Sequence, residues 1–193
     1  KNFVKVNGNI ASTPGISIDP QKDVVTVYNR IIRPQQKIYI MFYKPRGVLC
    51  SMKDPFHRKN LSHFFKSINE KIFHAGRLDK DSEGLLLLTN DGDFANILTH
   101  PKTHIPKEYI VKARGKIGKK DIQELKSGIV LDGKKTQPCE IAILSKKNES
   151  ITLKIILYEG KKRQIRRMLK AKGLVVTRLI RYRIGKLSIK GFS

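Results

Sequence analysis

The sequence predicts a fold of mixed α and β structure. Runs of strand-forming residues alternate along the chain with stretches in which apolar residues recur every three or four positions. The chain has 193 residues, of which 39% are apolar, and this is enough for one medium-sized domain with a real core. A small appendage beside that domain is all that the remaining length allows.

The first 33 residues read as short strands and turns. Asn7-Gly8 is a dipeptide typical of a tight hairpin, and residues 24–28 are rich in strand formers. Pro34, in the polar stretch that follows, discourages continued regular structure. We therefore expect a boundary at this point, with residues 1–33 as the appendage and residues 34–193 as the main domain.

The main domain is expected to begin with mixed elements and to continue mostly with strands. Strands are predicted at residues 38–43, 85–88, 109–113, 141–144, 151–157 and 175–179. Helices are predicted at residues 61–68, 94–98, 119–127 and 163–172. His100-Pro101 is expected to end the second of these helices, because proline cannot continue one.

The chain carries a large excess of positive charge, with 40 Lys and Arg against 16 Asp and Glu and a net charge of +24. Such a field attracts polyanions and opposes self-association, so nucleic acid is the expected partner and a monomer the expected state. The longest apolar stretch, residues 38–43, is far shorter than the roughly 20 residues needed to cross a bilayer, which predicts a soluble protein. Cys50 and Cys139 share no CxxC spacing, so we expect neither disulfides nor a zinc site, and a cytoplasmic location fits.

The densest cationic segment spans residues 161–183. Its ten basic side chains, with no acidic one among them, are Lys161, Lys162, Arg163, Arg166, Arg167, Lys170, Lys172, Arg178, Arg181 and Arg183. Four of these, from Arg163 to Lys170, share one helix face at spacings i, i+3, i+4 and i+7, while Ile165 and Leu169 lie on the other. Like charges at these spacings destabilise an isolated helix, so a bound polyanion would relieve the repulsion. An ordinary solvated face is the alternative.

Acidic residues concentrate between positions 70 and 93, where six of the sixteen lie. The segment that begins at Asp79 starts like a calcium-binding EF-hand loop, but its later ligand positions fall on core-like leucines, so calcium is not predicted. Residues 90–92 read as a turn after a buried strand. Asp79 precedes that strand in a loop with glycines on both sides, which would let RNA approach closely. A structural loop aspartate paired with Arg77 is the ordinary alternative.

Metal binding is not predicted elsewhere either. The five histidines are scattered without HxxxH spacing or neighbouring cysteine pairs, at His57, His63, His74, His100 and His104. Cys50 lacks the flanking pattern of a nucleophile, and a small buried residue is the better interpretation.

Residues 76–92, GRLDKDSEGLLLLTNDG, closely resemble the catalytic motif of RNA pseudouridine synthases of the RsuA/RluB type. Further matches follow in the family's order, with YKPRG at 43–47, KEY at 107–109, EGKKRQIRRM at 159–168, LIR at 179–181 and IG at 184–185. Together they span nearly all of residues 38–187. The resemblance implies an α+β pseudouridine synthase fold, with a mixed, mostly antiparallel sheet flanked by helices. It also implies that residues 1–33 are the remnant of an alpha-L RNA-binding module.

By this resemblance Asp79 matches the family's catalytic aspartate, Tyr109 its active-site tyrosine and Arg166 the basic residue that pairs with the aspartate. Isomerising uridine needs no redox change and no net hydrolysis, so no cofactor and no metal is expected. A carboxylate can attack the anomeric carbon or remove a neighbouring sugar proton, and both routes need Asp79 ionised. A guanidinium close by would keep it so. Tyr109 offers a ring to stack on the flipped uracil and a hydroxyl for proton transfer.

The resemblance also implies a role for the cationic side chains, which is to bind RNA phosphates. Extruding one nucleotide costs a few kcal/mol, and phosphate contacts offset that cost. The expected partner is ribosomal RNA, with the large subunit favoured. The expected RNA-binding residues are Lys44, Arg46, Arg77, Lys107, Lys161, Lys162, Arg163, Gln164, Arg167, Lys170 and Arg181. Two other functions remain open from the sequence. One is a noncatalytic RNA-binding or ribosome-assembly protein on the same scaffold, and the other is a metal-dependent nuclease using Asp79, Asp81 and Glu83.

Overall fold

The computed structural model describes residues 3–33 and 35–191, and its chain divides into two compact units, Lys1–Lys37 and Ile38–Ser193. The division falls after Lys37, a few residues beyond the boundary expected from the sequence, and Pro34, on which that expectation rested, lies outside the described residues. No described helix is both long enough and apolar enough to cross a membrane.

The first unit is a small antiparallel sheet in the strand order β2-β1-β3-β4. Its strands are β1 (Val4–Val6), β2 (Asn9–Ile10), β3 (Val25–Val27) and β4 (Arg30–Ile32). Asn7 and Gly8 join β1 to β2 with φ angles of +50° and +85°, the left-handed backbone that a two-residue hairpin turn requires. The hairpin predicted from this dipeptide is therefore confirmed. The Asn7 side chain also accepts a hydrogen bond from the Val24 amide at 2.8 Å, which ties the turn to β3.

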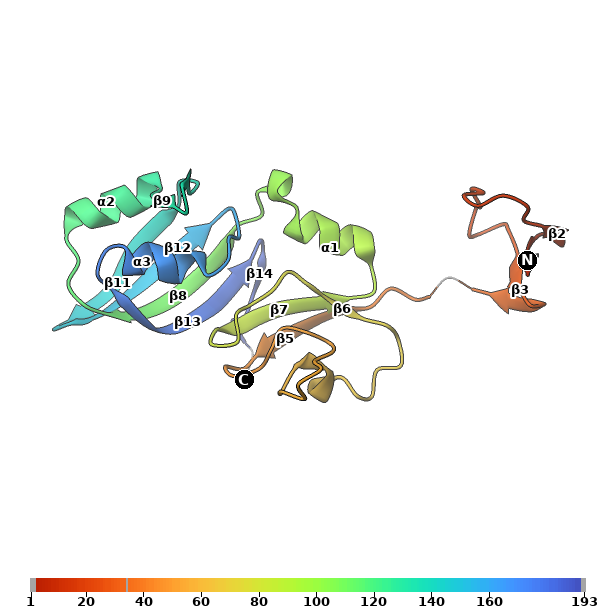
Figure 1. Ribbon diagram of the computed structural model, residues 1–193, viewed down its shortest axis with the longest axis horizontal. Coiled ribbons are helices and arrows are strands. Elements are labelled where there is room, and N and C mark those ends of the chain that lie inside the picture. Colours follow the sequence, from red (N-terminus) through yellow and green to blue (C-terminus); the bar gives the residue numbers. More distant parts are fainter. Residues whose placement is uncertain (1–2, 34, 192–193) are drawn as a thin grey trace. The chain divides into compact units, whose positions relative to one another are not determined.

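The second unit is built on an eight-stranded sheet, shown in Figure 1, whose main path runs β11-β12-β8-β13-β7-β5. Its strands are β5 (Tyr39–Lys44), β6 (Phe73–Ala75), β7 (Glu83–Thr89), β8 (Lys107–Arg114), β11 (Glu140–Lys147), β12 (Ser150–Leu157), β13 (Val175–Ile184) and β14 (Leu187–Ser188). Every pairing in this sheet is antiparallel except the short parallel contact between β13 and β7. The expected α+β class with a mixed, mostly antiparallel sheet is confirmed.

Three α-helices flank the sheet, and two short 3₁₀ helices and a small hairpin complete the unit. The helices are α1 (Gly92–Thr99), α2 (Lys119–Ser127) and α3 (Gln164–Lys170), the 3₁₀ turns are η1 (Leu61–Phe64) and η2 (Pro101–Thr103), and the hairpin joins β9 (Val130–Leu131) to β10 (Lys134–Lys135). In Figure 1, α2 and α3 lie beside the β11–β12–β8 part of the sheet, and α1 lies beside β6 and β7. Asp91 begins α1 by accepting hydrogen bonds from the amides of Asp93 and Phe94, as expected for the turn at 90–92.

The helix predicted at residues 61–68 is wrong, since only the single 3₁₀ turn η1 forms there. Its Asn60 cap satisfies the first amides, but Phe65 leaves helical geometry at once and packs edge-on against Phe42, with ring centroids 5.1 Å apart. Aromatic burial from a loop therefore outweighs the helical spacing. Strands β6, β14 and the β9–β10 hairpin escaped sequence analysis because each has only two or three residues.

The core explains the uninterrupted leucine run of β7, which is buried on both faces. Leu85 and Leu87 pack under α1, whereas Leu86 and Leu88 pack under the segment between β5 and β6. On the other half of the sheet, alternate residues of β8 and β12 pack against α2 and α3, with Leu125 and Leu169 fully buried at the centre. The apolar face predicted for the 163–172 helix is confirmed, because Ile165, Met168 and Leu169 are at most 4% exposed.

Candidate active site

A cavity of about 540 Å³ opens on the sheet face that α3 covers. Asp79, Tyr109 and Arg163 line it, together with four more residues from the predicted site, which are Arg77, Lys161, Lys162 and Gln164. These residues come from three segments far apart in the sequence, namely the loop between β6 and β7, strand β8, and the start of α3. The structure therefore brings half of the fourteen predicted site residues into one place, and Arg166 is not among the residues that line the cavity.

Asp79 lies on a loop whose backbone is held on both sides of the carboxylate. The buried Arg181 donates from a terminal nitrogen to the Arg77 carbonyl at 3.3 Å and from Nε to the Leu85 carbonyl at 2.7 Å. The Gly47 amide donates to the Lys80 carbonyl at 2.7 Å. Buried backbone groups that are paired in this way resist displacement, so Asp79 is presented on a fixed loop. Its side chain remains 31% exposed and is open to a ligand.

Arg163 is the cation closest to Asp79 in the described chain, with 3.7 Å between its guanidinium nitrogen and the carboxylate. The same guanidinium makes a bidentate pair with Asp81 at 2.9 and 3.0 Å. The hydrogen bonds from Arg163 hold the pKa of Asp81 below its ordinary value. One arginine therefore spans both acids at the mouth of the cavity.

The expected ion pair between Arg166 and Asp79 is corrected by this geometry. Arg166 turns away from the cavity, donating to the carbonyls of Asp81 at 2.9 Å and Val176 at 3.3 Å, and its Nε lies 3.4 Å from the Asp81 carboxylate. Arg163 stands just before α3 with a left-handed φ of +50°, which directs its side chain across the cavity instead. The helical spacing identified the basic face but could not show which arginine reaches Asp79.

Tyr109 contributes the apolar wall of the cavity. It lies in β8 directly opposite Arg181 of β13, and its ring belongs to the core cluster that also contains Leu78. Only 9% of the residue is exposed, and the part of the chain that the structure describes gives its hydroxyl no hydrogen-bond partner. A flat ring with an uncommitted hydroxyl suits an aromatic ligand that carries polar groups.

Two of the predicted RNA-binding residues, Lys44 and Arg181, are buried, and both donate hydrogen bonds within the protein. Lys44 has no exposed surface, and its ammonium donates to the carbonyls of Pro45 at 3.0 Å and Val48 at 2.8 Å. Arg181 is 3% exposed and holds the Asp79 loop as described above. A cation can be buried when carbonyls accept its donors, and counting charges along a sequence cannot reveal this.

Some of the other predicted RNA-binding residues are engaged within the protein, some are exposed, and Arg163 is both. Gln164 is buried and bridges the Lys161 amide to Glu159, and the Lys107 ammonium donates to the Ile105 carbonyl at 3.1 Å. Arg167 pairs with Asp132 at 2.5 Å, and Lys161 donates to the Lys135 carbonyl at 2.9 Å. The residues with exposed side chains are Arg46, Arg77, Lys162, Arg163 and Lys170.

The two remaining acids of the motif are held by arginines. Asp81 pairs with Arg163, and Glu83 accepts from Arg178 at 2.6 Å and from the Tyr43 hydroxyl at 3.0 Å. The hydrogen bond from Arg178 lowers the pKa of Glu83, while burial raises the pKa of Tyr43. Over residues 3–33 and 35–191 no group of three His, Cys, Asp or Glu side chains is placed to hold a metal ion. Of the three acids that a nuclease would need, Asp79 and Asp81 thus share Arg163, and Glu83 pairs with Arg178.

Comparisons with known proteins agree on one family. The family model for RNA pseudouridylate synthase matches residues 38–171. Ribosomal large subunit pseudouridine synthase B of Bacillus subtilis is 40% identical over 97% of this chain and 78% of its own length, and an RNA pseudouridine synthase of Aquifex aeolicus is 37% identical over 96% and 75%. A crystal structure of a pseudouridylate synthase superposes with a TM-score of 0.70 at 29% identity, over 97% of this chain and 80% of that one. The chain belongs to the RNA pseudouridylate synthase family and is an RNA pseudouridine synthase.

Proposed function

We propose that this enzyme converts a uridine of ribosomal RNA, in the large subunit, to pseudouridine, with Asp79 as the catalytic carboxylate. The observation that carries the proposal is the meeting of Asp79, Tyr109 and Arg163 in one cavity with a cationic rim. The substrate class is supported by the relative from Bacillus subtilis, whose name specifies the ribosomal large subunit.

The isomerisation has three steps. The glycosidic C–N bond of the uridine breaks, the uracil turns, and a C–C bond forms between the sugar and ring carbon five, which then loses its proton. Asp79 serves either by attacking the anomeric carbon or by removing a neighbouring sugar proton, and it must be ionised for both. The Arg163 guanidinium lies 3.7 Å from this carboxylate. The expected chemistry uses these side chains alone, with no cofactor and no metal.

Tyr109 is proposed to receive the extruded base. Its ring forms an apolar wall of the same cavity, against which a flipped uracil can stack. Its hydroxyl has no hydrogen-bond partner in the described chain and can accept the proton that leaves ring carbon five. Arg166 acts in this proposal as a positioning residue, because it holds the carbonyl of Asp81 two residues after the catalytic aspartate.

The exposed cations around the cavity are proposed to hold the phosphates of the RNA. Arg77, Lys162 and Arg163 line the cavity itself, and Arg46 and Lys170 are further exposed cations of the same domain. Phosphate contacts of this kind position the substrate and offset the cost of unstacking one nucleotide. The first unit, as part of an RNA-binding module, is proposed to add affinity, and the protein is proposed to act as a monomer.

The proposal is tested by tritium release from uridine labelled at ring carbon five, in unmodified large-subunit and small-subunit ribosomal RNA offered separately, with a chelator present. We expect release from large-subunit RNA only. Release from small-subunit RNA only would refute the substrate assignment. Binding of both RNAs without any release would refute the catalytic proposal and favour a noncatalytic RNA-binding protein.

A further inference from the structure

A loop of nine residues, 51–59, directly follows two residues that line the cavity, Leu49 and Cys50. Its base is fixed by two backbone hydrogen bonds, from the Leu49 amide to the Lys59 carbonyl at 2.9 Å and from the Leu61 amide to the Ser51 carbonyl at 3.0 Å. Leu49 itself lines the cavity that contains Asp79. The loop therefore starts beside the cavity in which the target nucleotide is proposed to bind.

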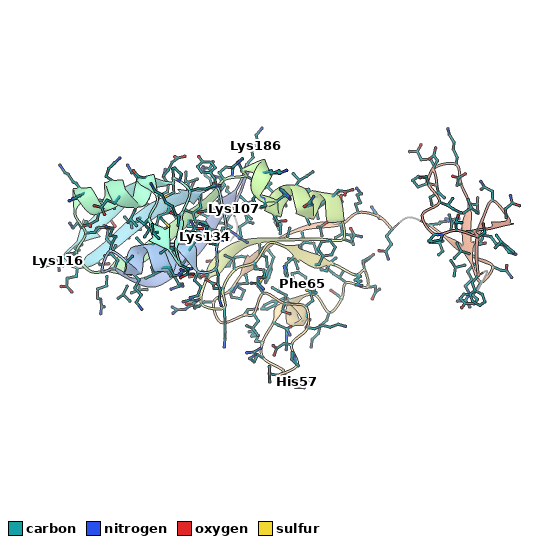
Figure 2. All side chains as sticks on the ribbon, turned by 45° about the horizontal axis from the view of Figure 1, so that its top comes forward. His57, Phe65, Lys107, Lys116, Lys134 and Lys186 are labelled. Atoms are coloured by element: carbon teal, nitrogen blue, oxygen red, sulfur yellow. The ribbon has the colours of Figure 1, made fainter. Side chains whose placement is uncertain are left out.

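Hydrogen bonds between Asp54 and Arg58 fix the conformation of the outer end of the loop. The Asp54 carboxylate accepts hydrogen bonds from the Arg58 amide at 2.9 Å and from its guanidinium at 2.6 Å. His57 closes the turn with a left-handed φ of +52°, and Figure 2 shows it at the end of the loop away from the sheet. Because these contacts fix the turn, the side chain of the neighbouring Phe56 is displayed from a defined backbone.

Phe56 gains no burial from the fold. It is 74% exposed, the largest value among the large apolar side chains of the described residues, and the Arg58 guanidinium lies 5.0 Å from the centre of its ring. A second pair of the same kind stands nearby, with the Lys59 ammonium 5.5 Å from the ring of Phe64, which is 39% exposed. Two exposed aromatic rings, each with a cation over its face, therefore lie close together in the sequence on this segment.

The surroundings of Phe56 specify the chemistry of its partner. Residues 51–66 carry four Lys or Arg side chains and one acid, Asp54, whose charge is already paired with Arg58. An aromatic face beside a guanidinium, within a cationic loop, is the arrangement that binds unpaired bases of a nucleic acid. A second copy of the chain does not fit, because it too carries a net charge of +24.

We propose that Phe56 stacks on an unpaired base of the RNA substrate close to the target nucleotide. The inference rests on the proposed function and deepens it, since it names a structural feature of the substrate, a single-stranded segment beside the modified uridine. Base stacking on an aromatic side chain corresponds to a roughly 5- to 150-fold change in Kd. Stacking acts on the bound substrate throughout the reaction, so it affects binding and KM and leaves kcat unchanged.

The test compares Phe56→Ala, Phe56→Leu and Phe56→Tyr for binding to a ribosomal RNA stem-loop that contains the target uridine. We expect the alanine and leucine variants to weaken binding about 5- to 150-fold and the tyrosine variant to stay within about twofold, because only tyrosine keeps the ring. The unfolding midpoint and kcat at saturating RNA should not change. Val130→Ala, which trims another exposed apolar side chain, is the matched control and should bind normally.

Abasic substitution along the RNA locates the stacked base. For the wild type, removing one base near the target should weaken binding, and in Phe56→Ala the same removal should have no further effect. The inference is overturned when Phe56→Leu binds as tightly as the wild type, or when every abasic penalty persists in Phe56→Ala. Because binding is measured directly, RNA that binds without being isomerised counts against the proposed function and leaves the stacking result readable.

Discussion

At the scale of single residues, Lys44 is a cation whose burial the sequence did not predict. Its motif led to an RNA-binding assignment, yet the ammonium is enclosed and its donors go to the carbonyls of Pro45 and Val48. Burial lowers the pKa of Lys44, but the surrounding acids of the Asp79 loop favour its charged form. The sequence shows that a lysine is present but not whether its side chain points inward or toward solvent. That depends on which backbone carbonyls the fold places around it.

Replacing this buried cation tests the assignment. Lys44→Met should lower the free energy of unfolding by about 2–4 kcal/mol, since two buried carbonyls lose their donor. Urea unfolding measures the change, and the exposed Lys170→Ala should stay within about 0.5 kcal/mol of the wild type. A fully stable Lys44→Met protein with weakened RNA binding would return Lys44 to the RNA surface.

The Asp54–Arg58 pair predicts a pH dependence at the same scale. The hydrogen bonds from Arg58 lower the pKa of Asp54 from 3.8 to about 2. Because the pKa is lowered, the pair stabilises the loop fully at pH values above 3.8 and is lost as the pH falls through about 2. At pH 3 the carboxyl should therefore remain mostly ionised, as followed by carbon NMR. In Arg58→Ala the midpoint should return to about 3.9, and an unchanged midpoint would show that Arg58 is not the cause.

At the scale of elements, the longer strands and the three α-helices were predictable because their apolar residues follow a single period. The leucine run of β7 reads as a strand buried on both faces, and the Ile165 and Leu169 spacing reads as a helix docked by one face. The segment at 61–68 was not predictable in this way, because two of its apolar residues, Phe64 and Phe65, pack their rings against Phe42 without a continuous helix. Which strands pair could not be predicted either, because the β13–β7 contact joins residues almost 100 positions apart.

Gly84 tests that contact. Its φ is +107°, and a Cβ at this position would lie 2.4 Å from the carbonyl oxygen of Arg181, so only glycine lets β7 and β13 approach. Gly84→Ala should lower the free energy of unfolding by more than about 2 kcal/mol and reduce activity, because displaced Arg181 no longer holds the Asp79 loop. Gly92→Ala, at the start of α1 with open space around it, is the control and should be neutral or slightly stabilising in thermal unfolding. An equally stable Gly84→Ala would contradict the close approach.

The basic face of α3 gives a second prediction for an element. Lys170 is exposed at the end of the helix, whereas Arg163 is also tied to Asp79 and Asp81, so Lys170 reports phosphate binding more cleanly. Lys170→Ala should weaken binding to different RNAs almost equally and flatten the dependence of log K on log salt by about one unit. Binding measured over a range of salt concentrations gives the slope. A slope equal to that of the wild type would mean that Lys170 faces solvent in the complex.

At the scale of the whole molecule, the active-site cavity is assembled where the sheet makes its one described parallel contact. Arg181 of β13 lies beside Gly84 of β7 and opposite Tyr109 of β8, which places the Asp79 loop, the tyrosine and the start of α3 together. Each of these pieces was recognisable in the sequence as part of a family motif. Their pairing was not, because whether Arg163 or Arg166 reaches Asp79 depends on one left-handed residue before α3.

The catalytic role of Asp79 is the central claim, and the sharpest comparison is between Asp79→Asn and Asp81→Asn. Both variants remove one negative charge from the same loop and from the same arginine, Arg163. Tritium release from ribosomal RNA should fall by at least about 1,000-fold in Asp79→Asn with RNA affinity retained, while Asp81→Asn should keep activity within about tenfold of the wild type. Substantial release by Asp79→Asn, or a silent Asp81→Asn beside an active Asp79→Asn, would contradict the account.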